Sequence, residues 1–405
     1  TEHLDYLTVT GGTISTFRSR GWNIPSAYYG LGTFVGLAGR IRSVVKTPVI
    51  VTGRIVTPDQ AEQVLESGAA DLIGMTRALI ADPDLPAKAK NQKTADIRVC
   101  MGSNEGCIDR LYLGLPIGCV QNPVVGREKS WKQITPSPKA KHIVVIGGGP
   151  SGMETARVAA LRQHRVTLLE RDSELGGAIR LAARAPGWES YLQCINWLEQ
   201  QLRQLKIDIR LETDATTELI GLLSPSAIVV ATGAEPRKPN LSGANLPHVF
   251  TVSDILTSST NASGRCVILD ETGYTPGVKT ADVLSQLGHE VEIVTRQYAL
   301  GEDIGTTVRA VLHERLLRAG VYITTLYTPV EITTSGVRLM HVLTDEERLI
   351  QADTVVLSSS GVGRDTLYNE LAEAKNYELH LIGDAFAPRH LRHAMVDGSR
   401  TGRIL

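Results

Sequence analysis

The chain has 405 residues and a formal net charge of −1, and 42% of its residues are hydrophobic and 21% charged. This length suggests two or three domains of ordinary globular composition. Neither nucleic-acid binding nor membrane insertion is expected. The charge is too small to attract either surface, and no apolar run approaches the roughly 18 residues of a membrane span.

Short strands and helices alternate at the start of the chain. We expect strands at 6–10, 48–52 and 71–74, and helices at 37–45, 57–67 and, interrupted by prolines, 78–89. This order predicts a parallel sheet or barrel. Three strands cannot close an eight-stranded barrel. We therefore expect the other strands to come from a missing part of the barrel or from a partner chain in an oligomer.

Two of these strands end in glycine and arginine. Gly53 and Arg54 follow one strand, and Thr76 and Arg77 follow the next. Barrel phosphate sites follow the last two strands, where backbone N–H groups and an arginine hold the anion. The spacing therefore indicates a phosphate site, with surface arginines as the alternative.

Three of the five cysteines lie close together, at Cys100, Cys107 and Cys119. The N-terminus does not resemble a secretory signal, so a reducing, cytoplasmic setting is expected and the thiols read as metal ligands before disulfides. Soft thiolates bind iron or zinc. A zinc ribbon needs a second Cys-x2-Cys pair, which this spacing lacks. Cys194 and Cys266 are expected to pack in the core.

A glycine-rich turn follows a linker at 134–139 and a strand at 143–146. Gly147, Gly149 and Gly152 form the G-x-G-x-x-G pattern, and a helix at 153–160 follows. These glycines allow the tight turn, the approach of a pyrophosphate and helix–strand packing, and the helix start attracts the anion. Glu170 ends the next strand, where it can accept from both ribose hydroxyls. The alternatives are a turn kept for packing and a solvated Glu170.

A second such unit has strands at 265–269 and 290–294, but its loop begins with Asp270 and Glu271. Carboxylates there repel a pyrophosphate and block its approach. The unit is therefore expected to be a scaffold that does not bind NAD(P)H, although Arg296 leaves NADP open. Late strands are expected at 353–357 and 380–382, and a short helix at 399–405.

Later glycine motifs extend the first nucleotide unit: Gly-Gly at 176–177, Thr-Gly at 232–233 and Gly-Asp at 383–384. Together with the glycine turn, they resemble the two-dinucleotide-domain flavoprotein reductases. In that family the late Gly-Asp lies near the flavin ribityl chain and the Gly-Gly lines the cofactor. The resemblance implies FAD, or bare ADP. The motif residues are Gly177, Thr232, Gly233, Gly383 and Asp384.

The cysteine segment, with Asn104 and the run 119–123, resembles that of the trimethylamine dehydrogenase and 2,4-dienoyl-CoA reductase family of old yellow enzyme-like iron–sulfur flavoproteins. That resemblance implies a [4Fe–4S] cluster. Ser103 replaces the second cysteine, which leaves three alternatives: a serine-ligated four-iron cluster, a [3Fe–4S] cluster, or no stable cluster. The same resemblance implies that Gly53, Arg54, Thr76 and Arg77 contact FMN.

The resemblance covers nearly the whole chain and implies an α/β fold: the C-terminal part of a (β/α)8 barrel, an iron–sulfur segment and two Rossmann-like nucleotide-binding domains. The expected limits are 1–95 for the barrel part, 96–140 for the iron–sulfur segment and linker, 141–240 for the FAD/ADP-binding domain, 241–350 for the degenerate second domain, and 351–405 for a return to the FAD/ADP-binding domain.

The resemblance implies an oxidoreductase of the amine dehydrogenase or N-demethylase type. A small amine or methylated substrate would reduce FMN, and electrons would pass to the cluster and on to an electron-transferring flavoprotein or similar carrier. The alternatives are a non-catalytic electron-transfer or scaffold subunit and an NAD(P)H-dependent enoyl reductase. Catalytic residues are unknown, because the family carries them on strands before Tyr6. Tyr28 and Tyr29 are expected to pack a loop, with a place at the substrate mouth as the alternative.

Overall fold

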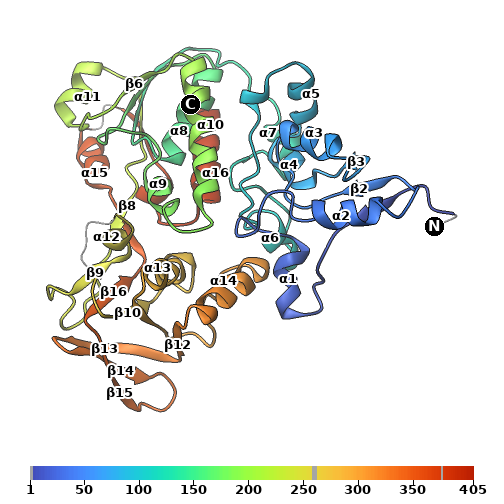
Figure 1. Ribbon diagram of the computed structural model, residues 1–405. Coiled ribbons are helices and arrows are strands. Elements are labelled where there is room, and N and C mark those ends of the chain that lie inside the picture. Colours follow the sequence, from blue (N-terminus) through green and yellow to red (C-terminus); the bar gives the residue numbers. More distant parts are fainter. Residues whose placement is uncertain (1–2, 258–261, 375–376) are drawn as a thin grey trace.

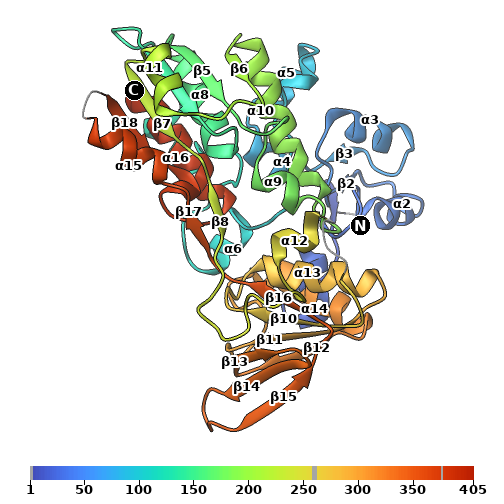
Figure 2. The same ribbon diagram turned by 90° about the vertical axis from the view of Figure 1, so that its left-hand side faces the viewer.

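A computed structural model describes residues 3–257, 262–374 and 377–405 (Figures 1 and 2). In both views the chain passes from a small N-terminal sheet, through a largely irregular segment, to two larger parallel sheets. None of the helices in these described ranges has the length and apolar character that crossing a lipid bilayer requires.

The N-terminal sheet is parallel and has the order β1-β2-β3, which confirms the expected strands. It contains β1 (Leu7–Val9), β2 (Val49–Val51) and β3 (Leu72–Ile73), and helices α2 (Val35–Arg42) and α3 (Pro58–Glu66) lie between the strands in sequence. Val49 and Val51 are fully buried and share a core cluster with Phe34. Thr57 caps α3, because its side chain accepts from the Gln60 N–H at 3.3 Å.

Residues 76–140 form only short helices. These are α4 (Thr76–Ala81), α5 (Leu85–Lys90), α6 (Ile108–Tyr112) and α7 (Glu128–Trp131), with one 3-10 turn, η1 (Thr94–Asp96). Met101 and Val120 of this segment are buried in the hydrophobic core of the first nucleotide unit. The segment is therefore anchored by packing rather than by regular structure.

The first nucleotide unit is a parallel sheet of order β18-β7-β4-β5-β6. One face packs on helices α8, α10 and α16, and the other packs on α11 and α15. This is the doubly wound arrangement that the alternating strands and helices predict. The strands are β4 (His142–Ile146), β5 (Arg165–Leu169), β6 (Asp208–Arg210), β7 (Ala227–Val230) and β18 (Glu378–Leu381); the helices are α8 (Pro150–Leu161), α9 (Ala178–Ala182), η2 (Glu189–Tyr191), α10 (Leu192–Gln204), α11 (Thr217–Leu223), α15 (Thr366–Glu373), η3 (Gly383–Ala385) and α16 (Leu391–Ile404).

The second unit is a parallel sheet of order β12-β11-β10-β16-β9 beside an antiparallel sheet of order β13-β14-β15. Its strands are β9 (Val249–Thr251), β10 (Arg265–Asp270), β11 (Glu290–Thr295), β12 (Tyr322–Thr325), β13 (Tyr327–Thr333), β14 (Gly336–His341), β15 (Glu347–Gln351) and β16 (Thr354–Ser358); its helices are α12 (Val252–Thr257), α13 (Thr275–Gln286) and α14 (Thr306–Arg318). A two-stranded ribbon of β8 (Ala234–Pro236) and β17 (Gly361–Gly363) links the two units.

Two expectations differ from the observed elements. The strand expected at 353–357 is β16, which pairs with β10, so the chain returns to the first unit at β17 rather than at 351. The helix expected at 399–405 is only the end of α16, which begins at Leu391. Gly398 and Gly402 lower the helix propensity of α16, but a Cβ at either position would collide with α8.

Candidate functional site

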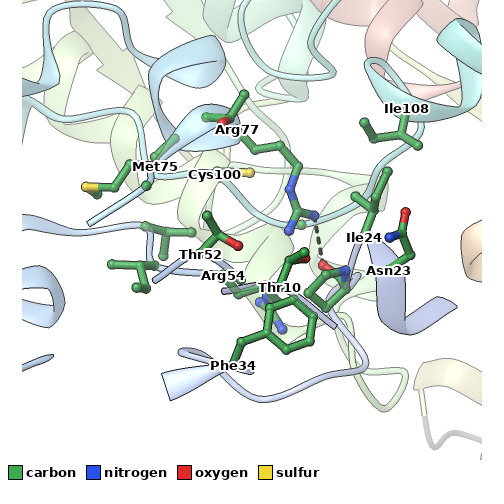
Figure 3. A pocket seen from close by; sticks show the side chains of 18 residues that line it. Thr10, Asn23, Ile24, Phe34, Thr52, Arg54, Met75, Arg77, Cys100 and Ile108 are labelled. Carbon is green, nitrogen blue, oxygen red and sulfur yellow. Dashed lines mark hydrogen bonds between the residues drawn. The ribbon is translucent and has the colours of Figure 1, made fainter. Parts of the chain in front are cut away.

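A cavity of about 250 Å³ lies where β2 and β3 end (Figure 3). Its lining comes from the barrel strands and from the cysteine segment, which meet here although they are distant in sequence. All four residues expected to contact a flavin phosphate or ring line this cavity, as does one cysteine: Gly53, Arg54, Thr76, Arg77 and Cys100.

Gly53 and Arg54 have unusual backbone conformations. Gly53 has a φ of +99°, and a Cβ there would lie 2.5 Å from the Phe34 ring, so only glycine fits. Arg54 has a φ of +57°, and its guanidinium donates to the carbonyl oxygens of Ala27, at 3.0 Å, and Tyr29. Its buried Nε has no hydrogen-bond partner among the described residues. Arg54 therefore fixes the 27–29 loop and keeps one donor free.

Arg77 is held by two acceptors. One guanidinium nitrogen donates to the Pro25 carbonyl at 2.8 Å and to the Asn104 side-chain oxygen at 2.7 Å. Figure 3 shows Arg77 reaching across the cavity toward the segment that carries Ile24. Asn104 in turn donates to the Ile24 carbonyl at 2.9 Å and to the Thr307 hydroxyl at 3.1 Å. Asn104 thus joins the cavity to helix α14 of the second unit.

The cavity is positively charged. Burial lowers the pKa of Arg54, the neighbouring Arg77 lowers it further, and Cys100 opposes this. Across the described ranges, neither arginine pairs with a carboxylate. Two unpaired guanidinium groups facing one cavity favour an anion such as a phosphate.

The three clustered cysteines come together beside this cavity. The backbone at Gly106 packs directly on Cys119, since a Cβ there would lie 3.0 Å from the Cys119 Cα. Burial raises the pKa of Cys107 to about 12, and Cys100 and Cys119 raise it as well. Burial also raises the pKa of Cys119, against the backbone N–H groups of Gln121 and Asn122 and against nearby Arg98. Cys100 lies both in this group and in the cavity wall.

Ser103, which stands where the second cysteine of the motif is expected, lies beside the buried Tyr191. It lowers the pKa of the Tyr191 hydroxyl, which burial raises strongly. The two hydroxyls do not reach hydrogen-bonding geometry, so the Tyr191 oxygen is buried without a partner among the described residues. Within the same ranges, no three His, Cys, Asp or Glu side chains converge closely enough for one metal ion.

The glycine turn has the predicted strand–turn–helix context. A Cβ on Gly147 or Gly152 would overlap backbone atoms, whereas one on Gly149 would meet nothing within 4 Å. Gly149 therefore leaves open space in front of α8. The Glu170 carboxylate accepts from the Gly148 N–H at 2.6 Å and from the Asp172 N–H at 2.9 Å. The Glu170 carboxylate therefore contacts two backbone N–H groups, one of them in the glycine turn, in addition to the ribose contact that the sequence predicts.

The later motifs gather around the same turn. A Cβ on Gly177 would lie 3.4 Å from the Gly149 Cα, and a Cβ on Gly383 would overlap Ser151 in the first turn of α8. The Gly233 carbonyl accepts from the Arg364 N–H at 2.9 Å, and the Thr232 hydroxyl donates to the Arg364 carbonyl. Asp384 accepts from the Arg389 N–H at 3.0 Å, and burial raises its pKa. Residues far apart in sequence therefore surround one loop.

Asp270 lies at the matching place in the second unit, at the end of β10. It is 3% exposed and accepts from the Thr272 N–H at 3.1 Å, the Thr272 hydroxyl at 2.7 Å and the Ser358 hydroxyl at 3.1 Å. Burial raises the pKa of Asp270. Glu271 pairs with Arg237 at 3.2 Å. The carboxylate thus lies before α13, where the first unit has its open glycine turn.

The sequence did not predict two contacts at this site, namely the Asn104 bridge and the contact of Lys279 with the Trp188 ring. Asn104 has a φ of +61°, and its bridge joins parts of the chain that are distant in sequence. Tyr28 packs as expected rather than lining a substrate mouth, because its hydroxyl accepts from the Trp188 indole at 2.7 Å. Lys279 of α13 is buried over the same Trp188 ring. Of these features, only the left-handed backbone of Asn104 could have been suspected from the sequence, because asparagine tolerates that conformation.

Known families match both ends of the chain. The NADH:flavin oxidoreductase / NADH oxidase family matches residues 22–96. The pyridine nucleotide-disulphide oxidoreductase family matches residues 125–222 and 222–380, which is more than half of the chain.

Two curated proteins and one solved structure illustrate the similarity. The N,N-dimethylglycine/sarcosine dehydrogenase of Chromohalobacter salexigens is 38% identical over 363 residues, covering 87% of this chain and 52% of that protein. The NADH oxidase of Thermoanaerobacter brockii is 34% identical over 361 residues, covering 88% of this chain and 55% of that protein. A 2-naphthoyl-CoA reductase complex superposes with a TM-score of 0.92 and 28% identity, covering 100% of this chain and 60% of that one.

This chain spans about half the length of the curated relatives it matches. The order of the matched segments and the parallel sheets agree with one assignment. The chain belongs to the trimethylamine dehydrogenase and 2,4-dienoyl-CoA reductase family of flavin-dependent oxidoreductases.

Proposed function

We propose that this chain carries the flavin-phosphate edge, the iron–sulfur segment and the nucleotide domains of an oxidoreductase of the amine dehydrogenase or N-demethylase type. The observation that carries this proposal is the place of Cys100. It lines the cavity that contains Arg54 and Arg77, and it also neighbours Cys107. A flavin pocket and a thiol cluster that share a wall can exchange electrons without a separate carrier.

The cavity residues fit the phosphate and ring edge of FMN. We propose that Gly53, Arg54, Thr76 and Arg77 contact it, with the free Nε of Arg54 and the guanidinium of Arg77 neutralising the phosphate. FMN, when bound, accepts a hydride or electrons from a substrate. Asn104 and the Pro25 carbonyl hold Arg77 in place, and Phe34 closes one wall.

The three clustered thiols suit an iron–sulfur cluster by their chemistry, because cysteine thiolates are the ligands that hold such clusters. We propose Cys100, Cys107 and Cys119 as ligands, with Ser103 either binding the fourth iron or leaving a three-iron cluster. The N–H groups of Gln121 and Asn122 then stabilise the Cys119 thiolate.

We propose FAD or ADP in the first nucleotide unit, bound by Gly147, Gly149, Gly152, Glu170, Gly177, Thr232, Gly233, Gly383 and Asp384. The open space before Gly149 supports this role, as does the gathering of the later motifs around it. The sheets support domain limits close to 1–95, 96–140, 141–240 and 241–350, with the return to the first unit at β17.

A small amine or methylated substrate and a carrier such as an electron-transferring flavoprotein complete the proposal. The 38% identity to the sarcosine dehydrogenase supports such a substrate. β1 and β3 form the two edges of their sheet, so we propose that further barrel strands, from the same protein or a partner chain, pair with them.

A reductase that uses NAD(P)H is the second candidate, and the 34% identity to the NADH oxidase favours it. The buried Asp270 before α13 opposes it, because a carboxylate there repels a pyrophosphate. The third candidate is a scaffold or electron-transfer subunit. It is favoured because the Arg54 guanidinium donates mainly to the 27–29 loop, which leaves fewer of its N–H groups for FMN.

The test is to quantify iron, FMN and adenine nucleotide per chain in anaerobically purified protein, with an EPR spectrum. The proposal expects bound iron together with a flavin or an adenine nucleotide. Bleaching of the flavin by an amine substrate but not by NADH supports the dehydrogenase, and the reverse supports the reductase. Iron and nucleotide without FMN supports the electron-transfer subunit, and protein without iron contradicts the proposal.

A further inference from the structure

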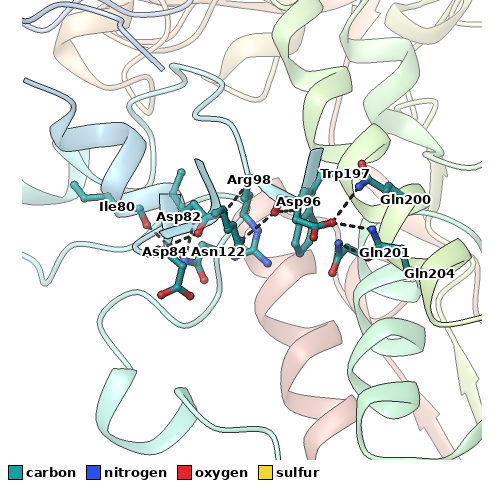
Figure 4. Close-up of polar contacts among 12 residues, drawn as sticks. Ile80, Asp82, Asp84, Asp96, Arg98, Asn122, Trp197, Gln200, Gln201 and Gln204 are labelled. Carbon is teal, nitrogen blue, oxygen red and sulfur yellow. Dashed lines mark hydrogen bonds and ion pairs between the residues drawn. The ribbon is translucent and has the colours of Figure 1, made fainter. Parts of the chain in front are cut away.

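Arg98 lies two residues before the first cluster cysteine and has an unusual environment (Figure 4). Its guanidinium stacks on Trp197 of α10, with the guanidinium carbon 3.9 Å from the ring centre. Its Nε is buried and has no hydrogen-bond partner in the described ranges. Its backbone N–H donates to Asp82 at 2.8 Å, so the main chain on this side is fixed.

The carboxylates around Arg98 are already engaged. Asp82 pairs with Lys88 at 2.6 Å. Glu154 pairs with Arg157 through two hydrogen bonds of 2.8 and 2.9 Å. No carboxylate among the described residues forms an ion pair with Arg98 itself.

A second cation aggravates this imbalance. The Arg157 guanidinium lies 5.3 Å from the centre of the same Trp197 ring. Two guanidinium groups at one aromatic ring, with the single carboxylate of Glu154 paired to Arg157, leave a half-buried positive charge on Arg98 that no carboxylate of the described ranges balances. Such a charge stabilises an anion placed beside it.

The chain beside Arg98 lies close to the clustered thiols. The Val99 carbonyl accepts from the Gln121 side chain at 2.6 Å, and Gln121 is two residues after Cys119, one of the three clustered cysteines. Cys119 and Cys194 are the thiols near enough to interact with the Arg98 charge. Arg98 is therefore a cation beside one of the three clustered cysteines, with no ion-paired carboxylate in the described ranges.

We propose that Arg98 is the counter-cation of the iron–sulfur cluster, compensating its negative charge at Cys119 and raising its reduction potential. The inference rests on the cluster of the proposed function and adds a residue that binds no iron. One-electron reduction makes the cluster more negative, so a fixed cation stabilises the reduced form. The stack on Trp197 holds the cation in place and excludes water from one of its faces.

The test is a potentiometric titration of the cluster, followed by EPR, in the full chain and in three variants. Arg98→Met removes the charge and keeps much of the apolar stem, and Arg98→Lys keeps the charge. Arg203→Met is the matched control, because Arg203 lies on the same helix as Trp197 with its side chain 78% exposed. Iron per chain and circular dichroism are measured on each.

Arg98→Met is expected to shift the equilibrium toward the oxidised cluster about tenfold, which is about 59 mV for one electron. Arg98→Lys is expected to retain most of the wild-type potential, and Arg203→Met all of it. Loss of iron in folded Arg98→Met but not in Arg98→Lys also supports the proposal. A cluster with wild-type potential in Arg98→Met contradicts it, as does equal iron loss in both Arg98 variants. Iron-free wild-type protein instead refutes the proposed function itself, before any variant is compared.

Discussion

The Arg77 guanidinium donates a hydrogen bond of 2.7 Å to the Asn104 side-chain oxygen, and the Asn104 amide donates to the Thr307 hydroxyl at 3.1 Å. One 2%-exposed side chain therefore joins the proposed flavin cavity to the second nucleotide unit. The left-handed backbone at Asn104 is fixed by these contacts.

Replacing Asn104 by alanine is expected to weaken FMN binding about tenfold and to destabilise the fold by about 2 kcal/mol, since buried donors and acceptors lose their partners. Fluorescence titration with FMN and urea unfolding measure the two effects. Thr307→Val is the matched control, because it breaks only the contact to α14. Equal loss of FMN affinity in both variants would show that Asn104 does not act through Arg77.

Replacing Ser103 by cysteine is expected to supply a fourth thiolate and to raise bound iron toward four per chain with a [4Fe–4S] EPR signature. Cys119→Ala is expected to lose most of the iron. Cys266→Ala serves as the control, because Cys266 is fully buried in β10, away from the three clustered thiols. Iron content that does not respond to Ser103→Cys or Cys119→Ala would remove these residues from the ligand set.

Two glycines of the first turn should respond differently to alanine. A Cβ on Gly149 meets open space, so Gly149→Ala is expected to keep the melting temperature and to lower ADP affinity at least about tenfold. A Cβ on Gly152 overlaps the Gly147 carbonyl, so Gly152→Ala is expected to destabilise the protein by about 2 kcal/mol or more. Calorimetry of ADP binding and thermal unfolding separate the two; unchanged ADP affinity in Gly149→Ala would mean that the turn serves packing alone.

The second unit is expected to bind NADH and NADPH more weakly than about 1 mM. Asp270→Gly removes the carboxylate before α13 and is expected to improve affinity at least about tenfold, because the repulsion of the pyrophosphate is lost. Isothermal titration with each dinucleotide measures this, with Glu271→Gln as a control that removes a nearby, more exposed charge. Tight NADH binding by the wild type would favour the reductase.

Asp109 predicts a pH dependence of stability. Burial, and next the charge of Glu105, raise its pKa to about 7, and its carboxyl lies against Gly305 at the start of α14. In the unfolded chain the group titrates near its ordinary value of about 4, so between pH 4 and 7 the folded state binds the extra proton. This contribution to stability is complete below about pH 4 and is lost as pH rises through 7.

Relative to Asp109→Asn, the wild type is therefore expected to lose up to about 1.4 kcal/mol of unfolding free energy per pH unit in that window. Urea unfolding at pH 5 and pH 8 measures the difference. Parallel pH profiles for the two proteins would contradict the raised pKa.

The strands and glycine turns of this fold could be predicted because their signals are local. The runs at 143–146 and 266–269 are uniformly apolar and lead into turns whose shape depends on glycine or on Asp270. Helix α16 was largely missed because glycines that fit it against α8 weaken its helical pattern. The sheet β13-β14-β15 was missed because β13 is mostly half-buried, β15 is mostly exposed, and these strands show little regular alternation between buried and exposed residues.

The site could be predicted only as a set of residue types. The sequence indicated that Arg54 and Cys100 belong to cofactor sites, but it could not indicate that Arg54 donates hydrogen bonds to the carbonyl oxygens of Ala27 and Tyr29. Such contacts depend on how loops distant in sequence meet. The unpaired charge of Arg98 is of the same kind, since it depends on which carboxylates are already taken.

Met101 and Val120 lie within the same apolar core as Ile143 and Leu198, on the far side of the linker at 134–139. A protein cut at that linker would remove Met101 and Val120 from a core whose other buried members all follow the linker, and would uncover Trp197, on which Arg98 stacks. Because they share one core, the cysteine segment and the first Rossmann-like sheet are expected to unfold in one cooperative step. They are likewise expected to be inherited, and to need expression, as a single unit. Shuffling of this chain with relatives would succeed at the β8–β17 ribbon sooner than at the linker.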